Sequence, residues 1–313
     1  MITLDHIRAA AARIDGNVRH TPMIAAANLK APIADAEVKL KLELLQVTGS
    51  FKARGATNRL LTTDKAELQR GIVTASGGNH GIATARAGHM AGVATTIFLP
   101  SNASPAKIAK LEAWGAATRI VGSAWHESNE AAQAFVRETG AVYFHPFADP
   151  AVVAGQGTVG LEILEQMPDV TTVLVAMGGG GLISGVATAV KALAPQVRVI
   201  GIEAEGSPVL LRSLEAGRNV ALDKVTTSVA TMACAKTDDR IFETVSRHVD
   251  EIVLVDDAEM LRAAKSLWFE MGLAADLSGA AAIAALMQGR VKVGKGDRVC
   301  AIVCGAGPEA VEK

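Results

Sequence analysis

Short apolar runs alternate with longer segments of helical periodicity along most of the chain. Gly, Ser, Asp or Pro marks each junction, a pattern typical of βα units on a parallel sheet. The predicted strands are residues 71–75, 94–99, 118–121, 170–176, 197–203, 251–255 and 298–303. This pattern predicts an α/β fold in which open, mainly parallel sheets are flanked by helices.

Helix starts are predicted where capping residues precede the periodic segments. Ser104 followed by Pro105 predicts an N-cap with proline at the first helical position, and Ser123 predicts a second cap. Further starts are predicted at Ser207-Pro208 and at residues 256–259, which have the pattern of a capping box. Two more helices are expected to begin near Gly81 and Leu182, directly after glycine-rich turns.

The order of the strands predicts two lobes. The chain has 313 residues, of which 50% are hydrophobic, so it is too long for one small domain. Residues 66–149 hold three βα units and form the predicted smaller, inserted lobe. Residues 1–65 and 150–313 form the predicted larger, cofactor-binding lobe, because the apolar segments 23–27 and 38–45 are expected to join its sheet.

Composition narrows the range of partners. The net charge is −1, without any basic stretch, so nucleic acid is not an expected partner and a small molecule is. The N-terminal residues lack the features of a signal peptide, and each apolar run is too short to cross a membrane, so a cytoplasmic protein is expected. Three cysteines without a CxxC pair predict reduced thiols, with neither a disulfide framework nor a zinc site.

Lys52 is the first candidate for chemistry. It follows Phe51 at a glycine-rich helix start, where the positive end of the helix dipole and the exclusion of water both disfavour the protonated amine. A neutral lysine amine can form a Schiff base with an aldehyde. Taken alone, Lys52 could equally be a solvated helix residue.

Three glycine-rich turns follow predicted strands, at residues 76–81, 178–181 and 304–307, and can face one cleft. The turn of Gly178, Gly179, Gly180 and Gly181, with the helix start near Leu182, is suited to a phosphate monoester. Ser184 breaks the dinucleotide pattern, and no P-loop lysine follows. The alternative to a phosphate site is that the four glycines only form a tightly packed turn from strand to helix. Together with a reactive lysine, the turn indicates an aldehyde cofactor with one phosphate, and pyridoxal phosphate is the common one.

The chain resembles the serine/threonine dehydratase and serine racemase family of fold-type II pyridoxal phosphate enzymes, which have the two-lobed tryptophan synthase β-like fold. The resemblance runs from about Leu4 to Gly307. It rests on these segments in order: Arg19-His20-Thr21-Pro22, Phe51-Lys52-Ala53-Arg54-Gly55-Ala56, Ser76-Gly77-Gly78-Asn79-His80-Gly81, His145-Pro146-Phe147, residues 155–162, the four glycines and Cys304-Gly305.

The resemblance implies a role for each site residue. Lys52 forms the Schiff base and removes the α-proton, Phe51 packs against the cofactor ring, and Asn79 hydrogen-bonds the ring hydroxyl. The four glycines, with Leu182, bind the phosphate, and Cys304 faces the pyridine nitrogen. A neutral thiol there favours prompt loss of a β leaving group over transamination. The substrate carboxylate is bound by backbone N–H groups of Ser76, Gly77, Gly78, Asn79 and His80. Without the glycine turn, Cys304 would be interpreted as a small core residue.

The implied activity is α,β-elimination from a 3-hydroxy L-amino acid such as threonine or serine, which gives a 2-oxo acid and ammonia. A homodimer is implied as well, and no C-terminal regulatory domain is expected. Glu203 matches one carboxylate of the cation site of some relatives, but its partner position is Val209, so no metal is expected.

Other activities stay open. Many threonine dehydratases have Ile-Ala-Asp-Gly-Leu where this chain has residues 228–232, and Glu-Pro-Ser-Gly-Ala where it has residues 276–280. A related lyase or racemase for hydroxyaspartate, an aryl-serine or a hydroxyectoine-derived compound is one alternative. The other is a binding protein for pyridoxal phosphate or another small molecule, without turnover. Gly77 stands where the racemases have a serine, which disfavours racemisation.

Overall fold

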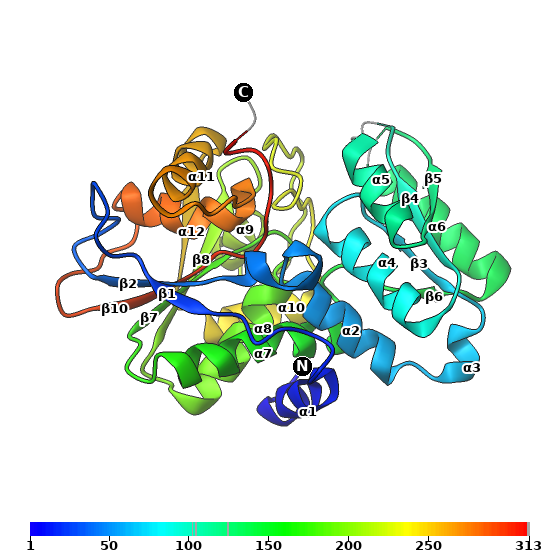
Figure 1. Ribbon diagram of the computed structural model, residues 1–313, viewed down its shortest axis with the longest axis horizontal. Coiled ribbons are helices and arrows are strands. Elements are labelled where there is room, and N and C mark those ends of the chain that lie inside the picture. Colours follow the sequence, from blue (N-terminus) through cyan, green and yellow to red (C-terminus); the bar gives the residue numbers. More distant parts are fainter. Residues whose placement is uncertain (102, 104, 124, 312–313) are drawn as a thin grey trace.

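Two open β-sheets flanked by helices form the computed structural model, which describes residues 1–101, 103, 105–123 and 125–311 (Figure 1). The strands are β1 (Met23–Ala25), β2 (Glu37–Lys41), β3 (Ile72–Ala75), β4 (Thr95–Leu99), β5 (Ala117–Ile120), β6 (Val142–Tyr143), β7 (Thr172–Ala176), β8 (Arg198–Ala204), β9 (Glu251–Val255) and β10 (Arg298–Ile302). One sheet has the order β5-β4-β3-β6 and the other β1-β2-β10-β7-β8-β9. Among the described strands, only the β1–β2 pair is antiparallel. The predicted α/β fold with mainly parallel sheets is confirmed.

The helices cover both sheets. They are α1 (Leu4–Ile14), α2 (Lys52–Thr62), α3 (Lys65–Leu68), α4 (Asn79–Ala91), α5 (Pro105–Ala113), α6 (Trp125–Thr139), α7 (Pro150–Gln166), α8 (Gly181–Leu193), α9 (Val209–Glu215), α10 (Asp239–His248), α11 (Asp257–Met271) and α12 (Leu277–Met287). Two short 3₁₀ turns, η1 (Glu43–Leu45) and η2 (Val47–Gly49), precede α2. Within the described part of the chain, no helix is both long and apolar enough to cross a membrane.

The predicted helix starts have different outcomes. The capping box before α11 is confirmed, since Asp256 Oδ1 accepts from the Glu259 backbone N–H at 2.6 Å and Glu259 Oε2 accepts from that of Asp256 at 2.9 Å. The helix predicted to begin near Gly81 is confirmed, and it begins two residues earlier, at Asn79, because Gly78 has the extended backbone of an N-cap.

The serine caps are less regular. The predicted cap at Ser104 lies outside the described residues, while Pro105 is the first residue of α5 as predicted. Ser123 lies just before α6, where its hydroxyl and N–H both hydrogen-bond Glu127 (3.2 and 2.7 Å). Ser207 does not cap α9, because Pro208 is the N-cap and the Ser207 hydroxyl donates to the Cys234 carbonyl at 3.1 Å.

Helix α2 lies where the two sheets approach each other (Figure 1). It packs against α7, which flanks the six-stranded sheet, and against α4, which flanks the four-stranded sheet. Two glycines allow the close contact with α7, since a Cβ atom on Gly155 would lie 2.7 Å from the Cα of Gly55. The first residue of α2 is Lys52, so the fold places this lysine at the junction of the sheets. The exact lobe boundaries at residues 66 and 149 remain a prediction.

The main core lies around the six-stranded sheet. Buried aliphatic side chains of β7, β8 and β10 pack there against those of α8, α11 and α12. Smaller apolar clusters flank the four-stranded sheet. The three cysteines are free and buried. With a core of this extent behind it, the sheet provides a rigid edge for the loops that follow its strands.

Candidate active site

The amine of Lys52 points into the protein from the first turn of α2. Its Nζ donates to the backbone carbonyl of Pro146 at 2.7 Å and lies 5.1 Å from the centroid of the Phe51 ring. Phe51 is the N-cap of α2, and its N–H donates to the carbonyl of Cys304 at 3.2 Å. The end of β10 is thereby joined to the start of α2, and three of the predicted residues lie together.

Burial changes the ionisation of this lysine. It lowers the pKa of Lys52 from 10.5 to about 8, a shift that the nearby thiols of Cys304 and Cys234 oppose. Two histidines face the same amine. Burial and the charge of Lys52 lower the pKa of His80 to about 3 and that of His145 to about 4. Both imidazoles are therefore neutral at physiological pH, and Lys52 is the group that can change charge near it.

This shift predicts how the cofactor-free protein reacts with pyridoxal phosphate. Since only the neutral amine attacks an aldehyde, we expect the rate constant to rise with pH and to level off above about 8. A lysine with the ordinary pKa of 10.5 would continue to gain reactivity up to about pH 10. Stopped-flow absorbance from pH 6 to 10 measures this, with Lys52→Ala as the control. A rate that keeps rising tenfold per pH unit beyond pH 9 would contradict the assignment.

The asparagine loop is held at the start of α4. Gly78 is the N-cap of this helix, and its N–H donates to Ser76 Oγ at 3.4 Å. Asn79 Nδ2 donates to Asp276 Oδ2 at 2.8 Å. His80 is buried, with Nε2 2.9 Å from the Phe144 carbonyl, and its Nδ1 has no hydrogen-bond partner among the described residues. The loop N–H groups lie at the positive end of α4, which suits a carboxylate.

The four-glycine turn leads from β7 into α8. Gly180 is the N-cap of α8 and has a φ of +86°, a value that favours glycine. The ring of Phe147 lies over the turn so closely that a Cβ on Gly179 would collide with it. Phe147 follows Pro146, whose carbonyl accepts from Lys52. One short segment thus connects the lysine to a turn without side chains at the positive end of α8, so the residues present fit a phosphorylated aldehyde.

Thr231 lies between the two glycine loops. Its carbonyl oxygen is 2.9 Å from where a Cβ of Gly178 would be, and its methyl carbon is 3.8 Å from where a Cβ of Gly78 would be. Ser228, at the start of the same segment, donates to Asp257 through its hydroxyl (2.6 Å) and its N–H (2.7 Å). The segment that departs from the dehydratase pattern is therefore at the site.

Glu203 binds the start of α9. Its two carboxylate oxygens accept from the backbone N–H groups of Leu210 and Leu211, each at 2.9 Å. Burial raises its pKa to about 7, although these two hydrogen bonds oppose the shift. In the described ranges, no group of three or more His, Cys, Asp or Glu residues is arranged to hold a metal ion. The contacts of Glu203 are those of a helix cap.

Asp276 is a residue of the site that the motifs did not assign. It is the N-cap of α12 and reaches Asn79, which is 197 positions away in the sequence. The pattern Asp-x-x-Gly before an apolar helical segment could have indicated the cap, but no local signal indicates the contact with Asn79.

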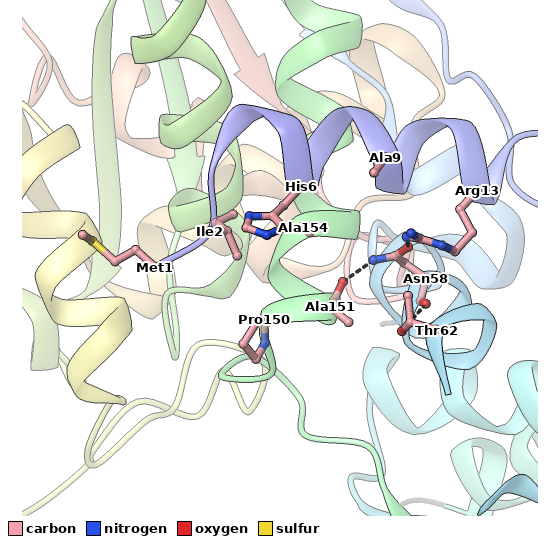
Figure 2. Close-up of a pocket in the computed structure, with 10 residues that line it drawn as sticks. All are labelled: Met1, Ile2, His6, Ala9, Arg13, Asn58, Thr62, Pro150, Ala151 and Ala154. Atoms are coloured by element: carbon pink, nitrogen blue, oxygen red, sulfur yellow. Dashed lines mark hydrogen bonds between the residues drawn. The ribbon is translucent and has the colours of Figure 1, made fainter. Parts of the chain in front are cut away.

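A separate pocket of about 240 Å³ lies between α1, α2 and α7 (Figure 2). Arg13 Nη1 donates there to Asn58 Oδ1 at 2.6 Å, and Asn58 Nδ2 donates to the Ala151 carbonyl at 2.7 Å. It is lined by Met1, Ile2, His6, Ala9, Arg13, Asn58, Thr62, Pro150, Ala151 and Ala154. None of these ten residues belongs to the predicted site, which lies at the opposite end of α2.

Comparison with known proteins identifies the class. Residues 14–305 match the family described as pyridoxal-phosphate dependent enzyme. An L-threonine ammonia-lyase of Thermotoga maritima is 40% identical over 305 residues, which cover 97% of this chain and 75% of that protein. A catabolic L-threonine dehydratase of Staphylococcus aureus is 35% identical over 292 residues, covering 93% and 84% of the two chains.

Solved structures of similar proteins support the same class. Maize serine racemase superposes with a TM-score of 0.91 at 32% identity, covering 97% of this chain and 93% of that chain. The processed form of threonine deaminase isoform 2 from Solanum lycopersicum superposes with a TM-score of 0.89 at 32% identity, covering 97% of this chain and 83% of that chain. The chain belongs to the family of pyridoxal-phosphate dependent enzymes, as the sequence resemblance predicts. Pyridoxal phosphate is its cofactor.

Proposed function

We propose that this enzyme is an ammonia-lyase that converts a 3-hydroxy L-amino acid of the threonine or serine type to a 2-oxo acid and ammonia. The observation that carries the proposal is the Lys52 amine. Its Nζ donates to the Pro146 carbonyl at 2.7 Å and is joined through Pro146 and Phe147 to the glycine turn, and burial lowers its pKa to about 8. The relatives named threonine ammonia-lyase, dehydratase and deaminase support the substrate class.

The proposed cofactor contacts follow the chain's own geometry. Lys52 would bind the aldehyde, with Phe51 beside the ring. Asn79 would face the ring hydroxyl and Cys304 the pyridine nitrogen. Burial raises the pKa of the Cys304 thiol far above its ordinary value, so it stays neutral. The phosphate would be bound by the backbone of Gly178, Gly179, Gly180, Gly181 and Leu182.

The proposed chemistry assigns a task to each residue. The bound cofactor withdraws electrons from the α-carbon of the amino acid, which makes its proton acidic. The amine of Lys52, set free when the amino group of the substrate takes its place, would accept that proton. The β-hydroxyl group would leave as hydroxide and become water by taking up the proton that Lys52 holds. Backbone N–H groups of Ser76, Gly77, Gly78, Asn79 and His80 would hold the substrate carboxylate. The released enamine hydrolyses in water to the 2-oxo acid and ammonia.

Racemisation is disfavoured by the space around Gly77. A Cβ at this position would lie 3.0 Å from Leu99 Cδ2, and glycine itself has no group that could protonate the second face. A substrate with a larger or differently charged substituent on the β-carbon is a second candidate, and the observation that favours it is Thr231. This exposed residue lies between the glycine loops, at a position where many threonine dehydratases have a glycine. A binding protein without turnover is disfavoured, because a binder needs no reactive lysine.

A substrate panel tests the proposal. The purified protein, loaded with pyridoxal phosphate, is incubated with L- and D-threonine, L- and D-serine, 3-hydroxyaspartate and 3-phenylserine, and release of 2-oxo acid and ammonia is measured. We expect the highest kcat/KM with L-threonine or L-serine. A preference for hydroxyaspartate or phenylserine would move the assignment to the second candidate. If no compound of the panel gave a product, the proposal that this protein is a lyase would be wrong.

We also propose that the protein is cytoplasmic and forms a homodimer, as the family resemblance implies. Trp268 and Phe269 near the end of α11 are 46% and 74% exposed, and such neighbouring apolar side chains suit a contact surface. Sedimentation of the purified protein tests the assembly. A monomer at micromolar concentration would contradict it.

A further inference from the structure

We infer that Asp276 is a positioning residue that fixes the orientation of the Asn79 amide toward the cofactor ring. The inference rests on the proposed function, in which Asn79 faces the ring hydroxyl. It also connects the two ends of the ring site, since the contacts run from Asn79 through Asp276 and Ser278 to Cys304. Asp276 itself touches none of the reacting atoms in this proposal.

The two oxygens of the Asp276 carboxylate have separate partners. Oδ1 accepts from the backbone N–H of Gly279 at 2.6 Å and from the hydroxyl of Ser278 at 2.7 Å, which is the capping contact of α12. Oδ2 accepts from Asn79 Nδ2 at 2.8 Å. Asp276 is only 6% exposed, so water competes little with these bonds. The helix cap needs one oxygen, and the other is directed at the asparagine.

This arrangement selects one of the two orientations of the Asn79 amide. An ionised carboxylate only accepts hydrogen bonds, whereas an amide has a donating and an accepting end. If the Asn79 amide turned over, its oxygen would face the oxygen of Asp276 at the same short distance. Asp276 therefore holds Nδ2 on its own side and leaves Oδ1 and the second N–H of Asn79 in defined directions.

A glycine makes room for the contact. A Cβ on Gly305 would lie 2.5 Å from Asp276 Oδ2 and 2.7 Å from Asn79 Nδ2, so any side chain there would collide with the hydrogen bond. The Gly305 carbonyl also accepts from the Asp276 backbone N–H at 3.0 Å. The turn after β10 therefore leaves space for the hydrogen bond between Asp276 and Asn79.

Ser278 extends the contacts to the other end of the ring site. Its hydroxyl donates to Asp276 at 2.7 Å, so its oxygen is left to accept from the Cys304 thiol, whose sulfur is 3.7 Å away. Asn79 and Cys304, proposed to face the ring hydroxyl and the pyridine nitrogen, are therefore oriented by the same buried carboxylate. Replacing the acceptor at Asp276 is therefore expected to change the binding of the cofactor and not only the stability of α12.

The test is Asp276→Asn, which keeps the size of the side chain and an oxygen to cap α12 but replaces the acceptor for Asn79 by a donor. We expect pyridoxal phosphate to dissociate roughly tenfold more readily, the size of a lost hydrogen bond to a charged group. The pH midpoint of the absorption change of the bound cofactor is expected to shift. The melting temperature of the cofactor-free protein is expected to change little.

Asp256→Asn is the matched control, because the Asp256 carboxylate caps α11 in the same way, accepting from the Glu259 backbone N–H at 2.6 Å, and belongs to no part of the proposed ring site. Its effect on cofactor affinity is expected to stay below about threefold. If Asp276→Asn does not fold, Asp276→Ser keeps a capping oxygen and lacks the atom that reaches Asn79.

The outcomes separate the two proposals. Cofactor affinity and a pH midpoint equal to those of the unchanged protein would mean that Asp276 only caps α12, and the inference would be wrong. If the unchanged protein also bound no pyridoxal phosphate at Lys52, the proposed site and this inference would both be overturned.

Discussion

Replacing Lys52 by alanine is expected to abolish the Schiff-base absorption band and to reduce 2-oxo acid release by about 10³-fold or more. The same amine is assigned two tasks, binding the aldehyde and accepting the α-proton. Neither the carbonyl of Pro146 nor the neutral imidazoles of His80 and His145 can replace it. Absorbance spectra of the loaded protein and steady-state turnover measure the two losses separately.

Two further variants make the test specific. Lys65→Ala, at the exposed start of α3, removes a lysine of the same type far from the turns and should retain both signals. Lys52→Arg keeps a positive charge at the start of α2 but cannot form a Schiff base, and it should behave like the alanine variant. An active Lys52→Ala protein that keeps its absorption band would refute the assignment of this residue.

The parallel sheets were predictable because each strand has a local pattern. Apolar runs bounded by Gly, Ser, Asp or Pro mark β3, β4, β7, β8, β9 and β10 within two residues of their observed ends. Strand β6 was missed, since a pair of residues has no periodicity to detect. The antiparallel pairing of β1 with β2 is set by tertiary packing, so local sequence patterns could not predict it either.

The site was predictable where a residue's own neighbours carry the chemistry. Lys52 and the glycines from 178 to 181 lie in such local patterns. No local pattern predicts the contact of Asp276 with Asn79, because it depends on how β10, α4 and α12 are placed next to one another. Glu203 matched one carboxylate of a cation site in some relatives, but no metal was expected because its partner position is Val209. The structure adds what Glu203 does, since both of its oxygens accept from backbone N–H groups at the start of α9.

A cluster of buried charges was also missed, since charged residues in a sequence are usually interpreted as exposed. Arg54 is 1% exposed and forms a two-bond ion pair with Glu43, at 2.8 and 2.7 Å. It also forms an ion pair with Glu162, at 2.5 and 2.9 Å, and Glu162 binds Lys41 at 2.5 Å. Two positive and two negative groups therefore balance beneath the first turn of α2.

The pKa values of the cluster follow from this balance. Burial alone would lower the pKa of Arg54, but Glu43 and Glu162 raise it above its ordinary value. Burial alone would raise the pKa of Glu162, but Arg54 and Lys41 lower it below 4.5. A carboxylate with a depressed pKa stabilises the folded state above its unfolded pKa and loses that contribution on acidification. The cluster is therefore expected to make stability fall as the pH drops below about 4.5.

Arg54→Ala is expected to lower the free energy of unfolding by about 3–5 kcal/mol, because Glu43 would remain buried without its charged partner. The melting temperature should fall by roughly 10 °C or more, and the loss of stability below pH 4.5 should become shallower as Glu162 loses a partner. Since Arg54 lies two residues after Lys52, weaker retention of pyridoxal phosphate is expected too. Thermal melts of the cofactor-free protein at pH 7 and pH 4 measure the fall in melting temperature and its dependence on pH.

Arg247→Ala is the matched control. Arg247 pairs with Glu243 one turn away at 2.6 Å, but both side chains are about half exposed, so we expect a loss below about 0.5 kcal/mol. Adding Glu43→Gln to Arg54→Ala removes the stranded charge and should recover part of the stability, since the penalty comes from an unpaired carboxylate and not from lost volume. A double variant no more stable than Arg54→Ala would show that packing, rather than charge balance, determines the effect.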